Sequence, residues 1–288
     1  MIKKAYFEIT NVCNMNCSFC PGTKRRKEFV SVEHFKNTAE KIRGKIPYLY
    51  LHLMGEPTIH PRLSEILEIA GENGFKVIIT TNGTTLGEKG ELLLGSDAIH
   101  KVSISLHSFE ANEGIGCMDE YLDGCFEFCQ RAAQKGIISV MRLWNLDGED
   151  TVGENENNPY ILARMRQFFG DEWVPSRSGM RIADKIFLEY GEKFDWPDPD
   201  KMAALDEKDG ARYFCHGLRD QIGILCNGDV VPCCLDGEGT IVLGNIFKSS
   251  LEDILSSKHA KDFYNSFSAG KAPHPLCRTC GYAKRFSK

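Results

Sequence analysis

Three cysteines near the start of the chain have a spacing that suits an iron–sulfur cluster. Residues 11–22 read N-V-C-N-M-N-C-S-F-C-P-G, so Cys13, Cys17 and Cys20 are arranged as Cys-x3-Cys-x2-Cys. Three thiolates can hold a cluster of four irons and leave one iron without a protein ligand. A catalytic metal needs such an open coordination position. The spacing therefore indicates a catalytic centre, since a structural zinc site would need a fourth ligand close by.

A second group of cysteines lies near the other end of the chain. Cys215 is followed by twelve residues, Gly228, four residues and Cys233, and a Cys-x2-Cys pair follows at Cys277 and Cys280. Four thiolates in this arrangement suit either a zinc ion or a second iron–sulfur cluster. The residues alone leave both alternatives open.

Composition and charge indicate the cellular compartment of the protein and the classes of partner that it can bind. The chain has twelve cysteines, but neither a signal peptide nor an apolar run of the ~18 residues that a membrane-spanning helix needs. We therefore expect a cytoplasmic protein with no membrane partner, in which clustered cysteines bind metal rather than form disulfides. The net charge of -5 argues against nucleic acid as a partner. The basic stretch Lys24–Lys27 is interpreted as a solvated loop, with a clamp for an anionic substrate as the alternative.

Strand-like and helix-like segments alternate through the first two thirds of the chain. Strands are expected over Ala5–Thr10, Tyr48–Met54, Phe75–Thr80, Val102–His107, Ile138–Trp144 and Ile186–Tyr190. Helices are expected near Val32–Arg43, Arg62–Asn73, Glu88–Leu94, Glu120–Gln134 and Tyr160–Phe169. This alternation predicts an α/β fold with a parallel sheet, either curled into a partial barrel or open. After residue 200 such units become sparse, so we divide the chain into domains 1–200 and 201–288.

The first cysteines, with Phe19 before the last of them, resemble the signature of the radical S-adenosylmethionine (SAM) superfamily. The resemblance implies a partial (β/α)6 TIM-like barrel and a SAM-binding [4Fe-4S] cluster on Cys13, Cys17 and Cys20. In that superfamily the open iron binds the amino and carboxylate groups of SAM. Reductive cleavage of SAM then yields a 5′-deoxyadenosyl radical, which abstracts hydrogen from the substrate.

Further residues resemble the SAM contacts of that superfamily. Gly55-Glu56-Pro57 is similar to its Gly-Gly-Glu-Pro motif, with Met54 in place of the first glycine, and implies a site for the SAM ammonium group. The other candidate contacts are Ser103 and Ser105 for the ribose, Arg142 for the carboxylate, Asn82 near the adenosine, and Phe19. For Arg142 the alternative is a side chain that extends to solvent at the end of the barrel.

The second group of cysteines, with its N-G-D-V-V-P-C-C context, resembles the auxiliary-cluster extension called SPASM in its shortened "twitch" form. The resemblance implies one auxiliary [4Fe-4S] cluster, bound by Cys215, Cys233, Cys277 and Cys280. Cys226 and Cys234 are left outside that set. Each is either a hydrogen donor to a substrate radical or a packing residue.

Two metal centres predict a redox enzyme. After hydrogen abstraction the substrate radical is a strong reductant, and an auxiliary cluster can accept its electron. The expected reaction is a two-electron oxidation (dehydrogenation) of a small molecule, with an electron donor such as flavodoxin or ferredoxin as partner. The alternatives are a peptide maturase or epimerase, which forms a crosslink or a D-residue, and, in a different class, a non-catalytic iron–sulfur electron carrier.

Overall fold

The computed structural model describes residues 2–112, 116–146, 155–204 and 212–285. Within them, eleven strands form one curved sheet in the order β11-β10-β9-β1-β2-β3-β4-β5-β8-β7-β6. Its centre consists of the parallel strands β1 (Lys4–Phe7), β2 (Tyr48–Tyr50), β3 (Lys76–Thr81), β4 (Ile99–Ser105), β5 (Ile138–Leu146) and β8 (Ile186–Glu192). These are the six strands expected from the sequence. The α/β class and the partial barrel are therefore confirmed.

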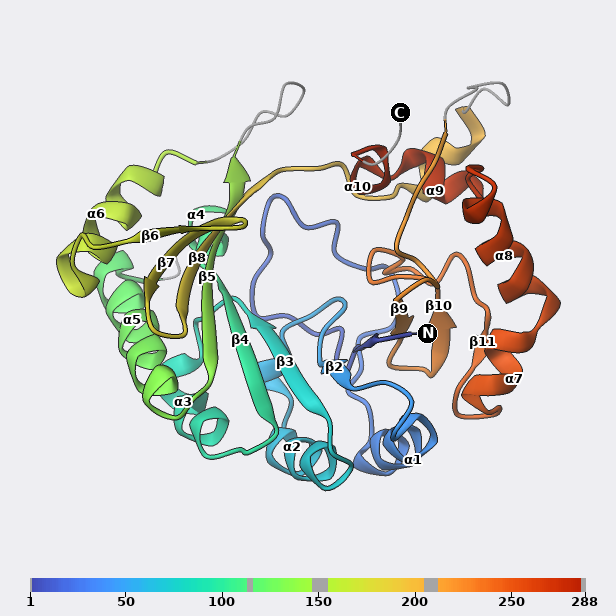
Figure 1. Cartoon of the computed structure of the whole chain (residues 1–288), viewed down its shortest axis with the longest axis horizontal. Helices are drawn as coiled ribbons and strands as arrows, with labels where there is room; N and C mark the ends of the chain where they lie inside the picture. Colours follow the sequence, from blue (N-terminus) through green and yellow to red (C-terminus); the bar gives the residue numbers. More distant parts are fainter. Residues whose placement is uncertain (1, 113–115, 147–154, 205–211, 286–288) are drawn as a thin grey trace.

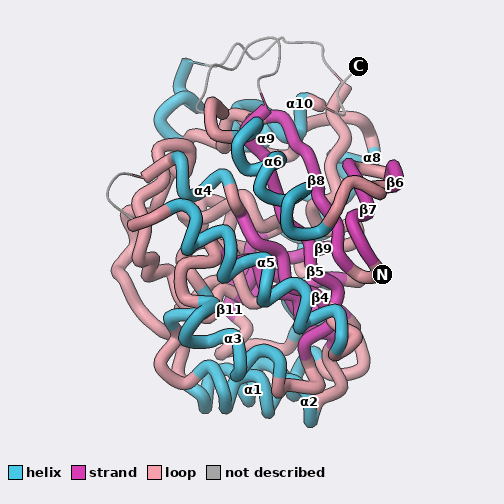
Figure 2. The backbone as a smooth tube through the Cα atoms, turned by 90° about the vertical axis from the view of Figure 1, so that its left-hand side faces the viewer, coloured by secondary structure: helices cyan, strands magenta, loops and turns pink. Residues whose placement is uncertain are grey.

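Helices cover the outer side of the curved sheet (Figure 1). Along the barrel they are α1 (Val32–Ile42), α2 (Leu63–Glu72), α3 (Leu86–Leu94), α5 (Met118–Gln134) and α6 (Asn158–Phe169). Each was expected, and their ends differ from the expectation by a few residues. Figure 2 shows α5 in front of the sheet, where it packs against β5 and α6. Within the described segments, no helix has both the length and the apolar character needed to cross a bilayer.

The first helix illustrates how the sequence builds this layer. Ser31 begins α1, since its Oγ accepts a hydrogen bond from the His34 backbone N–H at 3.1 Å. Phe35, Ala39 and Ile42 follow at helical spacing and are buried against the sheet. The ring of Phe35 stacks on Phe7 of β1, with 5.2 Å between centroids. The core of the molecule therefore lies between the sheet and the helices.

A short hairpin between α6 and β8 was not expected from the sequence. It consists of β6 (Val174–Ser176) and β7 (Gly179–Ala183), and β7 pairs antiparallel with β8. All three residues of β6 are exposed, and the middle one is Pro175. An edge strand of this kind lacks the alternation of apolar and polar residues by which strands are detected.

The C-terminal part of the chain extends the same sheet beyond β1. Strand β9 (Gln221–Ile224) pairs parallel with β1, and β10 (Asp229–Val231) and β11 (Gly244–Asn245) continue it antiparallel. The helices of this part are α7 (Leu251–Ser256), α8 (Lys258–Ser268), α9 (Pro275–Thr279) and α10 (Gly281–Lys284). The division into domains 1–200 and 201–288 stays a prediction.

The long loop between β1 and α1 lies inside the arc of the sheet (Figure 1, blue). It carries the first three cysteines. Because the central strands are parallel, the segments that follow them meet at one edge of the sheet. The loop after β1 therefore faces the ends of all the other barrel strands.

Candidate active site

A cavity of about 990 Å³ opens where the parallel strands end. Its walls include the segments after β1, β2, β8 and β10, residues near the ends of β3, β4 and β5, and residues of the C-terminal helices. All the cysteines predicted to bind iron line it, from both ends of the chain: Cys13, Cys17, Cys20, Cys215, Cys233, Cys277 and Cys280. In parallel α/β folds this is the end at which ligands bind.

The first three cysteines lie on one turn of the loop after β1. The Cys20 backbone N–H donates to the Cys17 carbonyl at 3.0 Å, and the Met15 N–H donates to Cys13 Sγ at 3.5 Å. All three thiols are free. Desolvation raises the pKa of Cys13 and of Cys20, so both thiols favour the protonated form until a metal displaces the proton.

The donor set in this cavity is thiol sulfur, which is the chemistry that iron–sulfur clusters require. Three free thiols come from the loop after β1, and five more come from the C-terminal part of the chain. Among the described residues, no group of three or more His, Cys, Asp or Glu side chains is arranged to hold a single metal ion.

Gly55, directly after β2, occupies a position where only glycine fits. Its φ is +77°, and a Cβ there would lie 2.5 Å from the Thr10 carbonyl oxygen and 2.7 Å from that of Val12. The next residue confirms the close approach, since the Glu56 N–H donates to the Val12 carbonyl at 2.8 Å. The segment after β2 is thereby fastened to the loop that carries the first cysteines.

Glu56 is a buried carboxylate with several hydrogen-bond donors around it. Oε1 accepts from the hydroxyl and the N–H of Thr58, at 2.6 and 3.1 Å, and Oε2 accepts from the Asn82 N–H at 2.7 Å. Burial raises the pKa of Glu56, and these hydrogen bonds act in the opposite direction. Met54, Gly55 and Glu56 line the cavity, whereas Pro57 begins a 3-10 turn (Pro57–Ile59) behind it.

The other predicted SAM contacts divide into two groups. Phe19, Asn82, Ser105 and Arg142 line the cavity. Ser103 does not, because it is fully buried within β4, and its Oγ has no hydrogen-bond partner in the described part of the chain. Strand β4 ends at Ser105, and the residue expected at the end of the strand, His107, instead begins the short helix α4 (His107–Glu110).

Arg142 lies beside Ser105, its partner in the pairing of β4 with β5. The guanidinium group stands over the ring of Trp144, 4.4 Å from its centroid, and Nη1 donates to Thr80 Oγ1 at 3.3 Å. Its nearest carboxylate is Glu189, at 3.6 Å from Nε. The side chain is 13% exposed, so it stays inside the sheet rather than extending to solvent.

The basic stretch after the first cysteines contains a residue that sequence reasoning missed. Arg25 Nη2 donates to both oxygens of Glu8, at 2.8 and 2.7 Å, and its Nε donates to the Gly237 carbonyl at 2.8 Å. Glu8 is completely buried. The solvated-loop interpretation is therefore wrong for Arg25, which joins the residue directly after β1, the cysteine loop and the C-terminal part of the chain.

The four C-terminal cysteines come from separate segments. Cys215 precedes β9, Cys233 follows β10, Cys277 lies on α9 and Cys280 directly follows that helix. Burial raises the pKa of all four thiols. The fold nevertheless brings all four to the wall of the same cavity.

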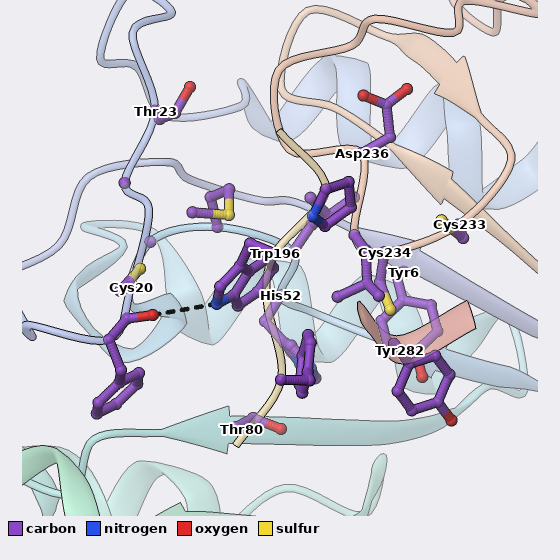
Figure 3. A pocket seen from close by; sticks show the side chains of 18 of the residues that line it. Tyr6, Cys20, Thr23, His52, Thr80, Trp196, Cys233, Cys234, Asp236 and Tyr282 are labelled. Atoms are coloured by element: carbon purple, nitrogen blue, oxygen red, sulfur yellow. Dashed lines mark hydrogen bonds between the residues drawn. The ribbon is translucent and has the colours of Figure 1, made fainter. Parts of the chain in front are cut away.

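The two cysteines outside the predicted sets occupy different environments. Cys226 does not line the cavity, and its Sγ donates to the Glu8 carbonyl at 3.1 Å. Cys234 lines the cavity and is hydrogen-bonded to Tyr6, beside it in Figure 3. The two remaining buried thiols, Cys125 and Cys129, lie in the core on α5, as expected.

A segment after β8 crosses from one group of cysteines to the other. Trp196 Nε1 donates to the Phe19 carbonyl at 3.1 Å, within the first cysteine loop (Figure 3). On its other side the segment is held by the Gly281 N–H, which donates to the Asp195 carbonyl at 2.9 Å, next to Cys280. No motif in the sequence marks this crossing, because its contacts join residues far apart in the chain.

His52 is a further residue that the sequence did not single out. It lines the cavity together with Tyr6, which is labelled beside it in Figure 3, and with Tyr50. The rings of Tyr6 and Tyr50 lie 5.6 and 5.8 Å from its own. Burial, with a smaller contribution from the nearby Arg142, lowers the pKa of His52 to about 3. The imidazole is therefore neutral near pH 7.

Two family profiles match the chain over these same regions. Residues 7–151 match the radical SAM superfamily, and residues 215–281 match SPASM, an iron–sulfur cluster-binding domain. The chain belongs to the radical SAM superfamily. As a radical SAM enzyme it binds SAM and a [4Fe-4S] cluster, and its SPASM domain binds additional iron–sulfur clusters. The alternative of a non-catalytic electron carrier is therefore set aside.

Individual relatives agree with this assignment. The antilisterial bacteriocin subtilosin biosynthesis protein AlbA of Bacillus subtilis is 34% identical over 97% of this chain and 65% of its own length. The tungsten-containing aldehyde ferredoxin oxidoreductase cofactor-modifying protein of Pyrococcus furiosus is 31% identical over 43% of this chain and 36% of its own length. The chain thus spans about two thirds of the length of AlbA and about one third of the length of the Pyrococcus furiosus protein.

Solved structures share the fold at low sequence identity. BtrN in complex with AdoMet and 2-DOIA aligns with a TM-score of 0.55 at 16% identity, over 97% of this chain and 93% of BtrN. Streptococcus suis SuiB bound to the precursor peptide SuiA aligns with a TM-score of 0.61 at 14% identity, over 99% of this chain and 70% of SuiB.

Proposed function

We propose that this radical SAM enzyme catalyses a two-electron oxidation of a substrate held between two iron–sulfur clusters. One observation carries the proposal: both groups of cysteines line the same cavity. Cys13, Cys17 and Cys20 are the proposed ligands of the SAM-associated cluster. The proposed ligands of the auxiliary cluster are Cys215, Cys233, Cys277 and Cys280. When bound, SAM and the first cluster supply the hydrogen-abstracting 5′-deoxyadenosyl radical, and the auxiliary cluster supplies an electron acceptor.

The chain's own residues bind and orient the cofactor in this proposal. Glu56, held by Thr58 and Asn82, offers negative charge to the SAM ammonium group. The Arg142 guanidinium, whose Nη1 donates to Thr80, is the proposed partner of the SAM carboxylate. Ser105 beside it is the proposed hydroxyl contact of the ribose. Trp196, fastened to the cysteine loop, shields the cavity from water.

The substrate class has two candidates. A small molecule is the first, because the cavity is bounded on both sides by the proposed cluster sites. A peptide is the second, and it is supported by the similarity to AlbA, which extends over nearly the whole of this chain. An electron donor such as flavodoxin or ferredoxin and a reducing cytoplasm complete the proposal, since free thiols and low-potential clusters need both.

Epimerisation is a competing outcome that a specific contact supports. Cys234 lies in the cavity wall next to Tyr6, where its thiol can return a hydrogen atom to a substrate radical. Cys226 is not proposed for this role, because its thiol donates to the Glu8 carbonyl outside the cavity.

Cys277→Ala distinguishes these outcomes. Small-molecule and peptide fractions of a cell extract are incubated with SAM and dithionite, and the fraction that stimulates 5′-deoxyadenosine formation supplies the substrate. The variant should still form 5′-deoxyadenosine with that fraction, but it should lose the product that lacks two hydrogens. Cys117→Ser is the matched control, since Cys117 is exposed and outside both sets. A product that has lost no hydrogens, and that is one mass unit heavier than the substrate when formed in D2O, would contradict oxidation and favour epimerisation.

A further inference from the structure

Asn112 reaches the first cysteine loop from the end of α4. Its Nδ2 donates to Cys17 Sγ at 3.1 Å and to the Ser108 carbonyl at 2.7 Å, and its Oδ1 accepts from the Asn16 backbone N–H at 2.8 Å. A parallel backbone contact joins the same two segments, since the Ser18 N–H donates to the Ala111 carbonyl at 3.1 Å. Asn112 and Cys17 are 95 residues apart in the chain.

The orientation of this carboxamide follows from its partners. A backbone N–H can only donate, so the oxygen of Asn112 must face Asn16. The NH2 group then faces the Ser108 carbonyl and the Cys17 sulfur, both of which accept. The flipped amide would place donor against donor and acceptor against acceptor at all three contacts. The N–H···S hydrogen bond is therefore fixed by the network around it.

We propose that Asn112 is a positioning residue that sets the reduction potential of the SAM-associated cluster through Cys17. The proposal rests on the proposed role of Cys17 as an iron ligand. One-electron reduction by dithionite or a protein donor adds negative charge to a cluster and its thiolates. An N–H donor at the sulfur stabilises the reduced state more than the oxidised state, so it raises the potential. Reduction of this cluster must precede SAM cleavage, so Asn112 adjusts the first step of turnover.

Two substitutions separate the hydrogen bond from simple anchoring of the loop. Asn112→Asp keeps the size of the side chain and an oxygen facing Asn16, but it places a carboxylate oxygen where the N–H donor was. Asn112→Ala removes the donor without adding charge. The matched controls are Asn14→Asp and Asn14→Ala. Asn14 lies in the same loop, but its Nδ2 donates to Thr84 Oγ1 at 2.8 Å rather than to a cysteine.

Each protein is reconstituted with iron and sulfide, its iron is counted, and it is titrated with dithionite under EPR. The signal that changes when SAM is added identifies the cluster with the open iron. At the wild-type midpoint, the ratio of reduced to oxidised cluster should fall about tenfold in Asn112→Asp, or about 59 mV for one electron. In Asn112→Ala the midpoint potential should shift in the same direction but by less. In each Asn14 variant it should shift by less than half as much as in the Asn112 variant with the same substitution.

Three results would overturn the role of Asn112. The first is a midpoint potential that shifts equally in the Asn112 variants and in the matching Asn14 variants. The second is an unchanged midpoint potential in Asn112→Ala at full iron content. The third is loss of iron from the Asn112 variants alone. Asn112 would then be required for assembly of the cluster rather than for its reduction potential. Failure of the proposed function would look different, because the wild-type protein itself would then show no SAM-responsive signal.

Discussion

The two groups of cysteines line one cavity but reach it in different ways. Cys13, Cys17 and Cys20 lie close together on one loop, and both Cys13 and Cys20 are exposed. The C-terminal cysteines come from separate segments, and Cys215 and Cys280 are buried. A local loop can present its thiols once a few hydrogen bonds hold it. The second group exists only after β9, β10 and α9 have packed, so metal binding there is coupled to folding.

The contact that joins the two regions should give the largest effect on stability. Arg25→Gln leaves the Glu8 carboxylate buried without its cation, and breaking a buried ion pair in this way costs about 3–5 kcal/mol. Anaerobic urea unfolding measures the loss. Arg26→Gln, at an exposed neighbour, should change the unfolding free energy by less than about 0.5 kcal/mol.

The double variant Glu8→Gln/Arg25→Gln checks the cause of that loss. It removes the buried charge together with its partner, so it should recover most of the stability. An unfolding free energy for Arg25→Gln equal to that of Arg26→Gln would show that the ion pair does not hold the two regions together.

Two glycine substitutions should each affect one of the two regions, and each should destabilise the protein less than Arg25→Gln does. Gly55→Ala forces a side chain into a left-handed conformation against the Thr10 carbonyl, at a cost of about 1–3 kcal/mol. Gly281→Ala places a Cβ 2.7 Å from the Asp195 nitrogen, next to Cys280. We expect Gly55→Ala to lower SAM binding, measured by calorimetry, and Gly281→Ala to lower the iron content of the auxiliary site. Similar losses at both sites in both variants would mean that the two regions respond as one.

Much of the first region could be predicted from the sequence, because its signals are local. Cys-x3-Cys-x2-Cys and Gly55-Glu56-Pro57 are short motifs, and their strands have regular patterns of apolar residues. The contact of Asn112 with Cys17 spans 95 residues and involves a residue type that is common in turns. The hairpin of β6 and β7 is exposed and has no alternating pattern. Such features depend on how distant segments pack against one another. Packing of this kind leaves no local pattern of residues in the sequence from which it could be predicted.

The smallest expected effect concerns His52, which lines the cavity. Its folded pKa, about 3, lies below its ordinary value of 6.5. The stability that the neutral imidazole contributes is therefore present above pH 6.5 and is lost as the pH falls toward 3. Between pH 6.5 and 5.5 the loss is about 1 kcal/mol. His52→Phe should flatten the unfolding free energy over that interval, and an unchanged slope would show that His52 titrates normally.

Iron analysis tests the central claim most directly, that each group of cysteines holds its own cluster in one cavity. Anaerobically reconstituted wild-type protein should bind about eight irons, the sum of two [4Fe-4S] clusters. Cys13/Cys17/Cys20→Ala should keep about four irons and form no 5′-deoxyadenosine. Cys277/Cys280→Ala should also keep about four, together with an EPR signal that responds to SAM. A native protein with one zinc and four irons, or loss of all iron from either variant while the protein stays folded, would contradict the claim.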